Sequence, residues 1–421
     1  MKRILVISWF YPPINSSEGM MTYKLLRHSR FSYDVFTQEG AEDWSYGIDR
    51  DCPESEGVRR ICARSSELST WMEEAYRYFI AHKDEYDMVM TRSMPPECHR
   101  VGLRIKKQYP EKRWIASFGD PIKDNPYELI GGTLQSPYSM KNSANRGRRL
   151  IFRLSPIRLL LLAVWNLRHA KALIRRRELA SLEEETIALA DALVFNNKSQ
   201  LRYMMHAAAP HKAVIIRHSY DLTLFPKPVI HNSDGRIRFV FTGQLNALRS
   251  AHPLLEAIAR LKEDVAELPC LAEFQFIGDM PDMDLAFILR HGLTDLVTVR
   301  PPVSYRCSLA EASSADWLIH IDGNIDAVTG ENVFFAGKIA DYFGAAKPIL
   351  AISMTRGDAA DCLRRAGAVL LSYSVNEIKQ ALYQIICLRR QPASMNTDYI
   401  RSFSAEQVAA EFDEKVVSRL L

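Results

Sequence analysis

Residues 330–351 of the chain read GENVFFAGKIADYFGAAKPILA. The pattern predicts a loop, then a helix that opens at Gly337 and is stopped by Pro348. The residues that follow, Ile349–Ala351, form a short apolar run that is typical of a buried parallel strand. This order of loop, helix and buried strand indicates an α/β protein.

The start of the predicted helix carries the first functional signal. Backbone N–H groups at a helix N-terminus lack helical partners and attract phosphate. Lys338 adds a positive charge there, and Asp341, three residues later, lies on the same helix face. We therefore expect Lys338 to bind phosphate and Asp341 to accept hydrogen bonds from a ribose.

The same alternation of strand and helix patterns runs through the whole chain. Alternation of this kind predicts parallel sheets covered by helices on both faces, and two series predict two doubly wound domains. The predicted strands are residues 4–7, 34–36, 88–90, 114–116, 193–195 and 214–216 in the first half, and 238–241, 274–277, 297–299, 317–321, 349–351 and 369–371 in the second.

The chain length of 421 residues also indicates two domains. We expect a first domain over residues 1–225 and a second over 226–403. Proline, asparagine and glycine residues place the linker at 221–235. The final helix, within residues 404–421, is expected to return to the first domain.

Five blocks in order resemble the glycosyltransferase group 1 family, whose members are retaining enzymes of GT-B fold. Residues 330–351 resemble its donor-nucleotide motif. The other blocks are Ile4–Pro13, Ala190–Asn197, Arg217–Pro226 and Phe239–Ala257. The likeness covers most of the chain and is strongest from about 190 to 352. It implies two Rossmann-like domains that face a cleft, the first (1–225) binding the acceptor and the second (226–403) the donor. It also implies sugar transfer from a nucleotide diphosphate-sugar.

The resemblance and the strand ends together give a set of expected donor-binding residues. Arg249 would clamp the diphosphate, and with Lys338 and the amides near 334–337 it would stabilise the departing charge. Tyr305 matches a family segment that holds the base, and it is expected to stack there. The full expected set is Gly19, Gly243, Arg249, Asp279, Tyr305, Glu331, Phe334, Gly337, Lys338 and Asp341.

Asp120 is the expected catalytic carboxylate, with Arg249 and Lys338 as the catalytic cations. It follows the predicted strand 114–116, at the sheet edge where α/β proteins bind ligands. A carboxylate there could position or deprotonate the acceptor hydroxyl. The alternative is that Asp120 only caps a helix or turn. Arg92 could also face the acceptor.

Composition excludes several classes of protein. A net charge of +4 is too small to indicate nucleic-acid binding. Seven scattered cysteines without a CxxC pair argue against a disulfide framework or zinc site, and they fit the reduced cytoplasm. We expect no bound metal or cofactor, and we interpret His320, Asp322 and Asp326 as polar loop residues. The chain has no apolar run of the roughly 18 residues that a spanning helix needs.

A basic amphipathic segment, residues 144–178, stands out within the first domain. From Arg146 to Arg177 there are ten basic residues and no acidic one, interleaved with leucine, isoleucine and tryptophan. Such a pattern is typical of a helix that lies on an anionic membrane surface. The alternative is a long helix of the domain with a solvated basic rim.

The sequence therefore predicts a cytoplasmic retaining hexosyl- or related glycosyltransferase, peripheral on the inner face of the cell membrane. Its acceptor would be a glycan or lipid-linked glycan, as in bacterial surface polysaccharide or glycolipid biosynthesis. Two alternatives stay open: a nucleotide-sugar epimerase of similar fold, and a non-catalytic GT-B scaffold. Gln244, Val333 and Asp341, which differ from the residues usual in the family, favour the scaffold.

Overall fold

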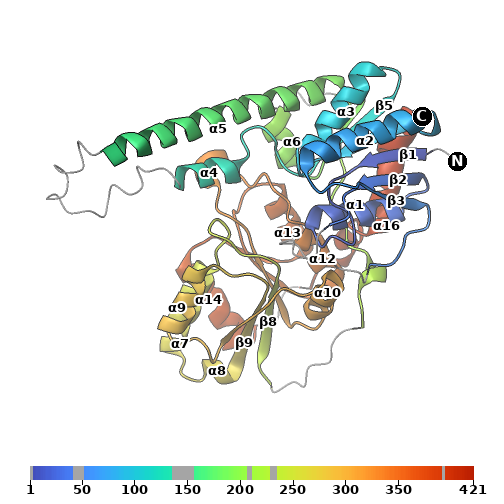
Figure 1. Cartoon of the computed structure of the whole chain (residues 1–421). Coiled ribbons are helices and arrows are strands. Elements are labelled where there is room, and N and C mark those ends of the chain that lie inside the picture. Colours follow the sequence, from blue (N-terminus) through green and yellow to red (C-terminus); the bar gives the residue numbers. More distant parts are fainter. Residues whose placement is uncertain (1–2, 41–51, 135–155, 206–210, 228–234, 391–393) are drawn as a thin grey trace.

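The protein has two parallel α/β domains, which confirms the predicted fold class (Figure 1). The computed structural model describes residues 3–40, 52–134, 156–205, 211–227, 235–390 and 394–421. Of the expected linker, residues 228–234 lie outside this set. Both sheets are buried by helices on their two faces, as parallel sheets require.

The first sheet has seven strands in the order β3-β2-β1-β4-β5-β6-β7. Neighbouring strands pair in parallel throughout. The sequence did not predict the edge strand β3, because Arg59 and Arg60 interrupt its apolar pattern. The strands are β1 Arg3–Ile7, β2 Ser32–Thr37, β3 Val58–Cys62, β4 Met88–Arg92, β5 Arg113–Phe118, β6 Ala192–Phe195 and β7 Ala213–Ile215.

The second sheet has six strands in the order β10-β9-β8-β11-β12-β13. All of its pairs are also parallel, and each strand coincides with a run that the sequence predicted. The strands are β8 Ile237–Thr242, β9 Ala272–Ile277, β10 Val297–Arg300, β11 Trp317–Ile321, β12 Ile349–Ile352 and β13 Val369–Leu371.

Helices connect the strands in both domains. Those of the first domain are α1 Ser17–Arg27, α2 Leu68–His82, α3 Glu97–Gln108, α4 Pro126–Leu134, α5 Pro156–Leu189 and α6 Lys198–Met205. Those of the second are α7 His252–Asp264, α8 Leu268–Leu271, α9 Asp282–Arg290, α10 Tyr305–Ser313, α11 Asp326–Thr329, α12 Gly337–Ala345, α13 Asp358–Ala366, α14 Val375–Ile386 and α15 Thr397–Arg401.

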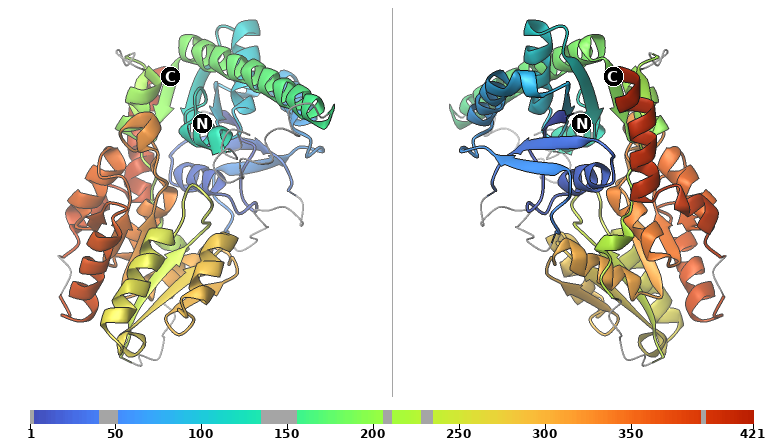
Figure 2. Two further views of the ribbon diagram at one scale, coloured as in Figure 1. Left: turned by 90° about the vertical axis from the view of Figure 1, so that its left-hand side faces the viewer. Right: turned by 90° about the vertical axis from the view of Figure 1, so that its right-hand side faces the viewer.

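The end of the chain lies on the first domain. Figure 2 shows the red terminal helix running beside that domain, and α16, Ala405–Phe412, packs against α1. Phe412 is fully buried in the first-domain core. Asp413 accepts hydrogen bonds from the Ser29 hydroxyl at 2.6 Å and the Arg30 N–H at 2.8 Å. These contacts tie the terminal helix to the carboxyl end of α1.

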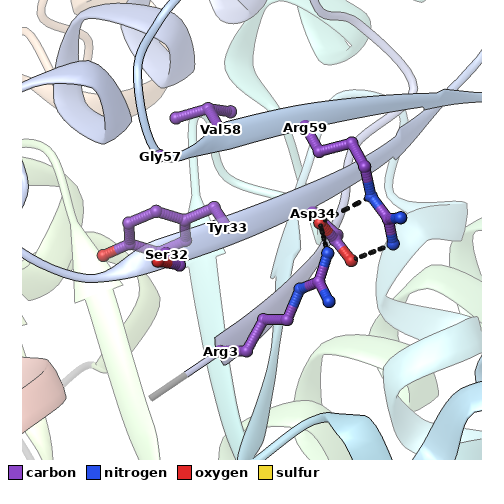
Figure 3. A pocket seen from close by; sticks show the side chains of 7 residues that line it. All are labelled: Arg3, Ser32, Tyr33, Asp34, Gly57, Val58 and Arg59. Carbon is purple, nitrogen blue, oxygen red and sulfur yellow. Dashed lines mark hydrogen bonds and ion pairs between the residues drawn. The ribbon is translucent and has the colours of Figure 1, made fainter. Parts of the chain in front are cut away.

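The amino ends of β1 to β3 carry a charged cavity of about 410 Å³ (Figure 3). The buried carboxylate of Asp34 accepts hydrogen bonds from Arg3 at 2.9 Å, Arg59 at 2.7 Å and Tyr86 at 2.6 Å. Burial alone would raise the pKa of Asp34, but these donors hold it below its usual value. Because its donors saturate the carboxylate, we assign this cluster to the stability of the sheet edge.

The basic segment coincides in part with the long helix α5. Its carboxyl-terminal part packs against α3, whereas in Figure 1 its amino-terminal part extends away from the domain. Arg175 pairs with Glu97 and Arg176 with Asp124, at the packed end. Residues 144–155 of the segment lie outside the described set. Among the helices of the described chain, none is both long and apolar enough to cross a membrane.

Candidate functional site between the domains

Two helix N-termini, one from each domain, meet at the carboxyl ends of the sheets. Gly337 opens α12, and a Cβ added to it would lie 2.9 Å from Ser17 Oγ and 3.0 Å from Met21 Cε of α1. A side chain at this position would require the Ser17 or Met21 side chain to move, and glycine avoids this. The residue before it, Ala336, has no side chain that caps the helix. The first N–H groups of α12 therefore suit an anionic ligand, as the sequence predicted for this position.

Gly19 lies in the first turn of α1, where packing requires it. Its N–H donates to the Oγ of the capping residue Ser16 at 3.0 Å. An added Cβ would lie 2.9 Å from that Oγ and 3.2 Å from the Tyr11 Cα. The Gly19 N–H is thus occupied, and the glycine lets the helix start pack against the loop after β1.

Lys338 projects from the first turn of α12 toward the end of β8. Its Nζ donates to the Thr242 carbonyl at 2.8 Å and lies 3.9 Å from the centroid of the Phe241 ring. Gly243, with φ of +112°, follows directly, and a Cβ there would lie 2.8 Å from the Lys338 Nζ. The glycine therefore leaves space for the ammonium group. Burial, and then the nearby Arg249 guanidinium, hold the pKa of Lys338 well below its usual value.

Arg249 comes from the loop after β8 and is anchored by a buried acid. Its Nη2 lies 3.7 Å from Asp322 Oδ1, while Asp322 Oδ2 accepts from His320 at 2.9 Å and Asn332 at 3.0 Å. Burial by itself would lower the pKa of Arg249, but the interactions with Asp322 and then Tyr127 raise this pKa above its usual value. The Nε atom of Arg249 is buried and has no hydrogen-bond partner within the described residues. The Arg249 side chain as a whole is 22% exposed, so the charged side chain remains open to a ligand.

Asp120 faces this cation from the first domain, at the end of β5. Burial, and then the Glu18 carboxylate, raise the pKa of Asp120 to about 7, against the opposing charges of Arg249 and Arg92. Glu18 is itself held by Arg92, whose Nε donates to it at 3.0 Å. A carboxyl group with a pKa near neutrality can exchange a proton with a substrate hydroxyl.

Asp341 is not free where the two domains meet. Its Oδ1 accepts hydrogen bonds from Lys24 Nζ of α1 at 2.8 Å and from the Tyr305 hydroxyl at 2.7 Å. The Lys24 side chain is fully buried. Burial, and then the Asp341 charge, raise the pKa of Tyr305 well above its usual value. The acid expected to bind ribose and the ring expected to stack on the base thus contact one another and the first domain.

Glu331 also contacts the first domain. Its carboxylate accepts from Arg202 at 2.7 Å and from the Ser199 hydroxyl at 2.9 Å, both on α6. The loop after it turns inward, because Val333 is buried in an apolar cluster. Phe334 stacks on Tyr127 of α4 with 4.5 Å between ring centroids. This loop therefore joins the domains before it enters α12.

Two further residues lie at the edges of the site. Asp279, which follows β9, is exposed, and its Oδ2 accepts from Gln244 Nε2 at 3.3 Å. His218 is buried near the junction, and burial with the charges of Arg92 and Lys24 lowers its pKa to about 3. His218 is thus neutral at physiological pH, in keeping with a structural role.

The sequence missed four residues that shape this site: Glu18, Lys24, Tyr127 and Asp322. Glu18 and Lys24 lie on the first helix, directly after the loop that follows β1. Their nearness to that loop is the sequence signal that could have indicated a place at the site. The sequence pattern predicts Asp322, together with His320, as a polar loop residue. Both are buried, with His320 within β11, because Arg249 and Asn332 supply the partners that a buried carboxylate requires.

One group in the described part of the chain has metal-ligand geometry, at the far end of α1. It consists of His28, Asp221 and Glu406. Arg27 Nη1 also lies 3.3 Å from the Asp221 carboxylate. Because the Arg27 guanidinium already pairs with the Asp221 carboxylate, we assign these three residues a structural role. They lie where α1, the interdomain connection and α16 meet.

No family model matches the sequence, and no curated protein matches it either. Solved structures do match over the whole chain. A sucrose-phosphate synthase from Thermosynechococcus elongatus superposes with a TM-score of 0.66 at 14% identity, covering 100% of this chain and 98% of the other. A lipopolysaccharide outer core galactosyltransferase gives 0.58 at 10% identity, with 99% of each chain covered. A UDP-N-acetylglucosamine 2-epimerase gives 0.51 at 11% identity, covering 100% and 96%. The chain is therefore a protein of GT-B fold, the two-domain architecture that these enzymes share.

Proposed function

We propose that the protein is a retaining glycosyltransferase that moves a sugar from a nucleotide diphosphate-sugar to an acceptor hydroxyl. One observation carries the proposal. Lys338 Nζ is held at the end of β8 beside the uncapped N-terminus of α12, and Arg249 comes from the loop after that strand. Burial, and then the Arg249 charge, lower the pKa of Lys338. Like charges held together repel, and an anion between them relieves the repulsion. A diphosphate has the charge and size for this position.

The same cations would act on the reaction itself. When the bond between sugar and diphosphate breaks, negative charge grows on the leaving oxygen. Arg249, Lys338 and the first N–H groups of α12 would stabilise that charge more strongly than the charge of the bound donor. Because side chains and helix dipole supply this positive charge, the proposal needs no bound metal ion.

Asp120 would serve the acceptor. It lies across the junction from Arg249 and belongs to the first domain, where the acceptor is expected. With a pKa of about 7, it can be deprotonated at neutral pH and still take a proton from the attacking hydroxyl. We name no protein nucleophile for the retaining reaction.

We further propose that the acceptor is a glycan or lipid-linked glycan at the inner face of the cell membrane, in surface polysaccharide or glycolipid assembly. Leu173 and Ile174 on α5 are each 56% exposed, next to the arginine run. Apolar and basic side chains side by side suit the surface of an anionic bilayer. One of the matching structures is a lipopolysaccharide galactosyltransferase.

A nucleotide-sugar epimerase is the second candidate, because a UDP-N-acetylglucosamine 2-epimerase also shares the fold. A non-catalytic scaffold is the third, favoured by the contact that holds Asp341 against Lys24. Incubation with radiolabelled nucleotide-sugars and candidate acceptors separates the three. Transferred label supports our proposal, released or altered sugar supports the epimerase, and unchanged donor in every reaction supports the scaffold.

A further inference from the structure

A second basic cavity lies between the domains, apart from the Arg249–Lys338 pair. Its volume is about 390 Å³, within the range of small-molecule sites. α6 and the connection after β7 line one side, and α13 and α15 line the other. Five of its lining residues are basic and two are acidic, which leaves a surplus of three positive charges: Lys198, Arg202, Arg217, Arg364 and Arg365 against Asp358 and Asp361.

Two helix N-termini add to the positive potential of this cavity. α6 begins at Lys198 and α13 begins at Asp358, and each helix caps the other. The Lys198 N–H donates to Asp358 Oδ2 at 3.0 Å, and the Asp358 N–H donates to Ser199 Oγ at 2.9 Å. The positive ends of both helix dipoles therefore lie at this cavity.

Several of the cations have no close carboxylate. Arg364 pairs with Asp361 at 3.1 Å, and Arg202 pairs with Glu331. Within the described residues, however, the ammonium of Lys198 and the guanidinium of Arg365 form no ion pair. Arg365 instead lies 4.2 Å over the Tyr399 ring, which orients it.

Arg217 is a third cation of this cavity whose acidic partner is shared. Its nearest acid is Asp358, at 3.8 Å, and the same carboxylate already accepts the Lys198 N–H. Its Nε is buried and has no hydrogen-bond partner among the residues described. The Arg217 side chain as a whole is 23% exposed, so part of it remains open to a ligand.

We propose that this cavity binds the phosphoryl group of a small soluble molecule, at a site distinct from that of the donor diphosphate. Arg217 and Arg365 would hold the phosphate oxygens, since planar guanidinium groups suit that geometry. Lys198 would add a point charge at the rim. The ligand would contact both domains at once. The inference does not depend on sugar transfer, because it rests on a different set of residues.

Titration calorimetry with inorganic pyrophosphate tests the site. The parent protein is expected to show two binding classes. Lys198→Gln/Arg365→Gln should weaken one class by roughly tenfold or more, because it removes two charged donors. Lys338→Ala should weaken only the other class. Arg260→Gln/Lys262→Gln on α7 removes the same charge elsewhere and should leave both classes within about twofold of the parent.

Two results would overturn the inference. One is that the parent binds pyrophosphate in a single class, which Lys338→Ala weakens and Lys198→Gln/Arg365→Gln leaves unchanged. That result would leave the proposed donor site intact. The other is an equal loss in the control variant, which would indicate nonspecific attraction. Sedimentation with vesicles containing phosphatidic acid separates the sources of phosphate. Unchanged sedimentation of Lys198→Gln/Arg365→Gln supports a soluble ligand, and its loss assigns the cavity to a lipid headgroup instead.

Discussion

The Nζ of Lys24 lies 2.8 Å from the Oδ1 of Asp341, and this ion pair joins the first helix of one domain to α12 of the other. The lysine side chain is fully buried and the aspartate side chain is 11% exposed. Tyr305 donates to the same oxygen at 2.7 Å. The position of α12, and with it that of Lys338, therefore depends on a contact made by the first domain.

Removing one member of this pair should destabilise the protein strongly. Asp341→Leu leaves the Lys24 charge buried without compensation, which costs about 3–5 kcal/mol for buried pairs. The double variant Lys24→Met/Asp341→Leu, which removes both charges, should cost less than Lys24→Met and Asp341→Leu together. Urea unfolding of the parent, the two single variants and the double variant gives the coupling. The exposed pair Lys415–Glu411 is the control, where about 0.5 kcal/mol is expected.

A coupling near zero at Lys24 and Asp341 would mean that the contact does not hold the domains together. The ribose role of Asp341 is tested separately by nucleoside binding. If ribose contacts this acid, Asp341→Ala weakens nucleoside and nucleoside diphosphate alike. If neither ligand is weakened, the acid serves the domain contact alone.

Asp120→Asn should slow sugar transfer by at least about a hundredfold, the lower range for general acid–base catalysis. Nucleoside diphosphate affinity should hardly change, because the proposed partner of Asp120 is the acceptor. In the parent, the transfer rate should rise with pH around the pKa of about 7, and this rise should vanish in the variant. Transfer assays over a pH series measure it. Near-normal turnover of Asp120→Asn would remove the residue from the mechanism, and Asp282→Asn on α9 serves as the exposed control.

The same carboxyl group should make stability depend on pH. The pKa of Asp120 rises from 3.8 to about 7 in the folded protein, so between these values the folded state binds a proton that the unfolded state has lost. The free energy of unfolding should therefore fall as pH rises from about 4 to about 7. Relative to Asp120→Asn, the parent should lose stability over that window. Parallel curves for the two proteins in urea unfolding would contradict the raised pKa.

The membrane proposal is best tested through apolar side chains. Arg175 and Arg176 pair with Glu97 and Asp124, so reversing their charge would disturb the fold as well as the surface. Leu173→Ser/Ile174→Ser should instead weaken sedimentation with anionic vesicles, because both side chains are more than half exposed.

The matched control for this pair lies on α9. Met283 and Leu289 are 81% and 71% exposed, and Met283→Ser/Leu289→Ser should leave sedimentation unchanged. Equal weakening by both pairs, or no sedimentation of the parent, would count against a membrane surface on α5.

The strands and the position of Lys338 at the start of a helix could be predicted because their signals are local. An apolar run after Pro348 is enough to indicate β12, and Lys338 follows a helix-opening glycine. The partners of Glu331 and Asp341 could not be predicted, because they lie 129 and 317 residues away in sequence. Such contacts depend on how two domains dock. The pKa of Asp120 likewise depends on Glu18, which the chain brings beside it only in the folded state.

The central claim is that Lys338 and Arg249 hold a diphosphate without a metal ion. The measurement is calorimetric binding in EDTA of a nucleoside and its diphosphate, chosen from UDP, GDP, ADP and dTDP by the largest thermal shift. Lys338→Ala should weaken the diphosphate about ten- to hundredfold, equivalent to about 1.5–3 kcal/mol, and hardly affect the nucleoside. The exposed-residue control Lys415→Ala should affect neither. Equal weakening of both ligands by Lys338→Ala, or diphosphate binding by the parent only with Mg²⁺ or Mn²⁺, would contradict the account.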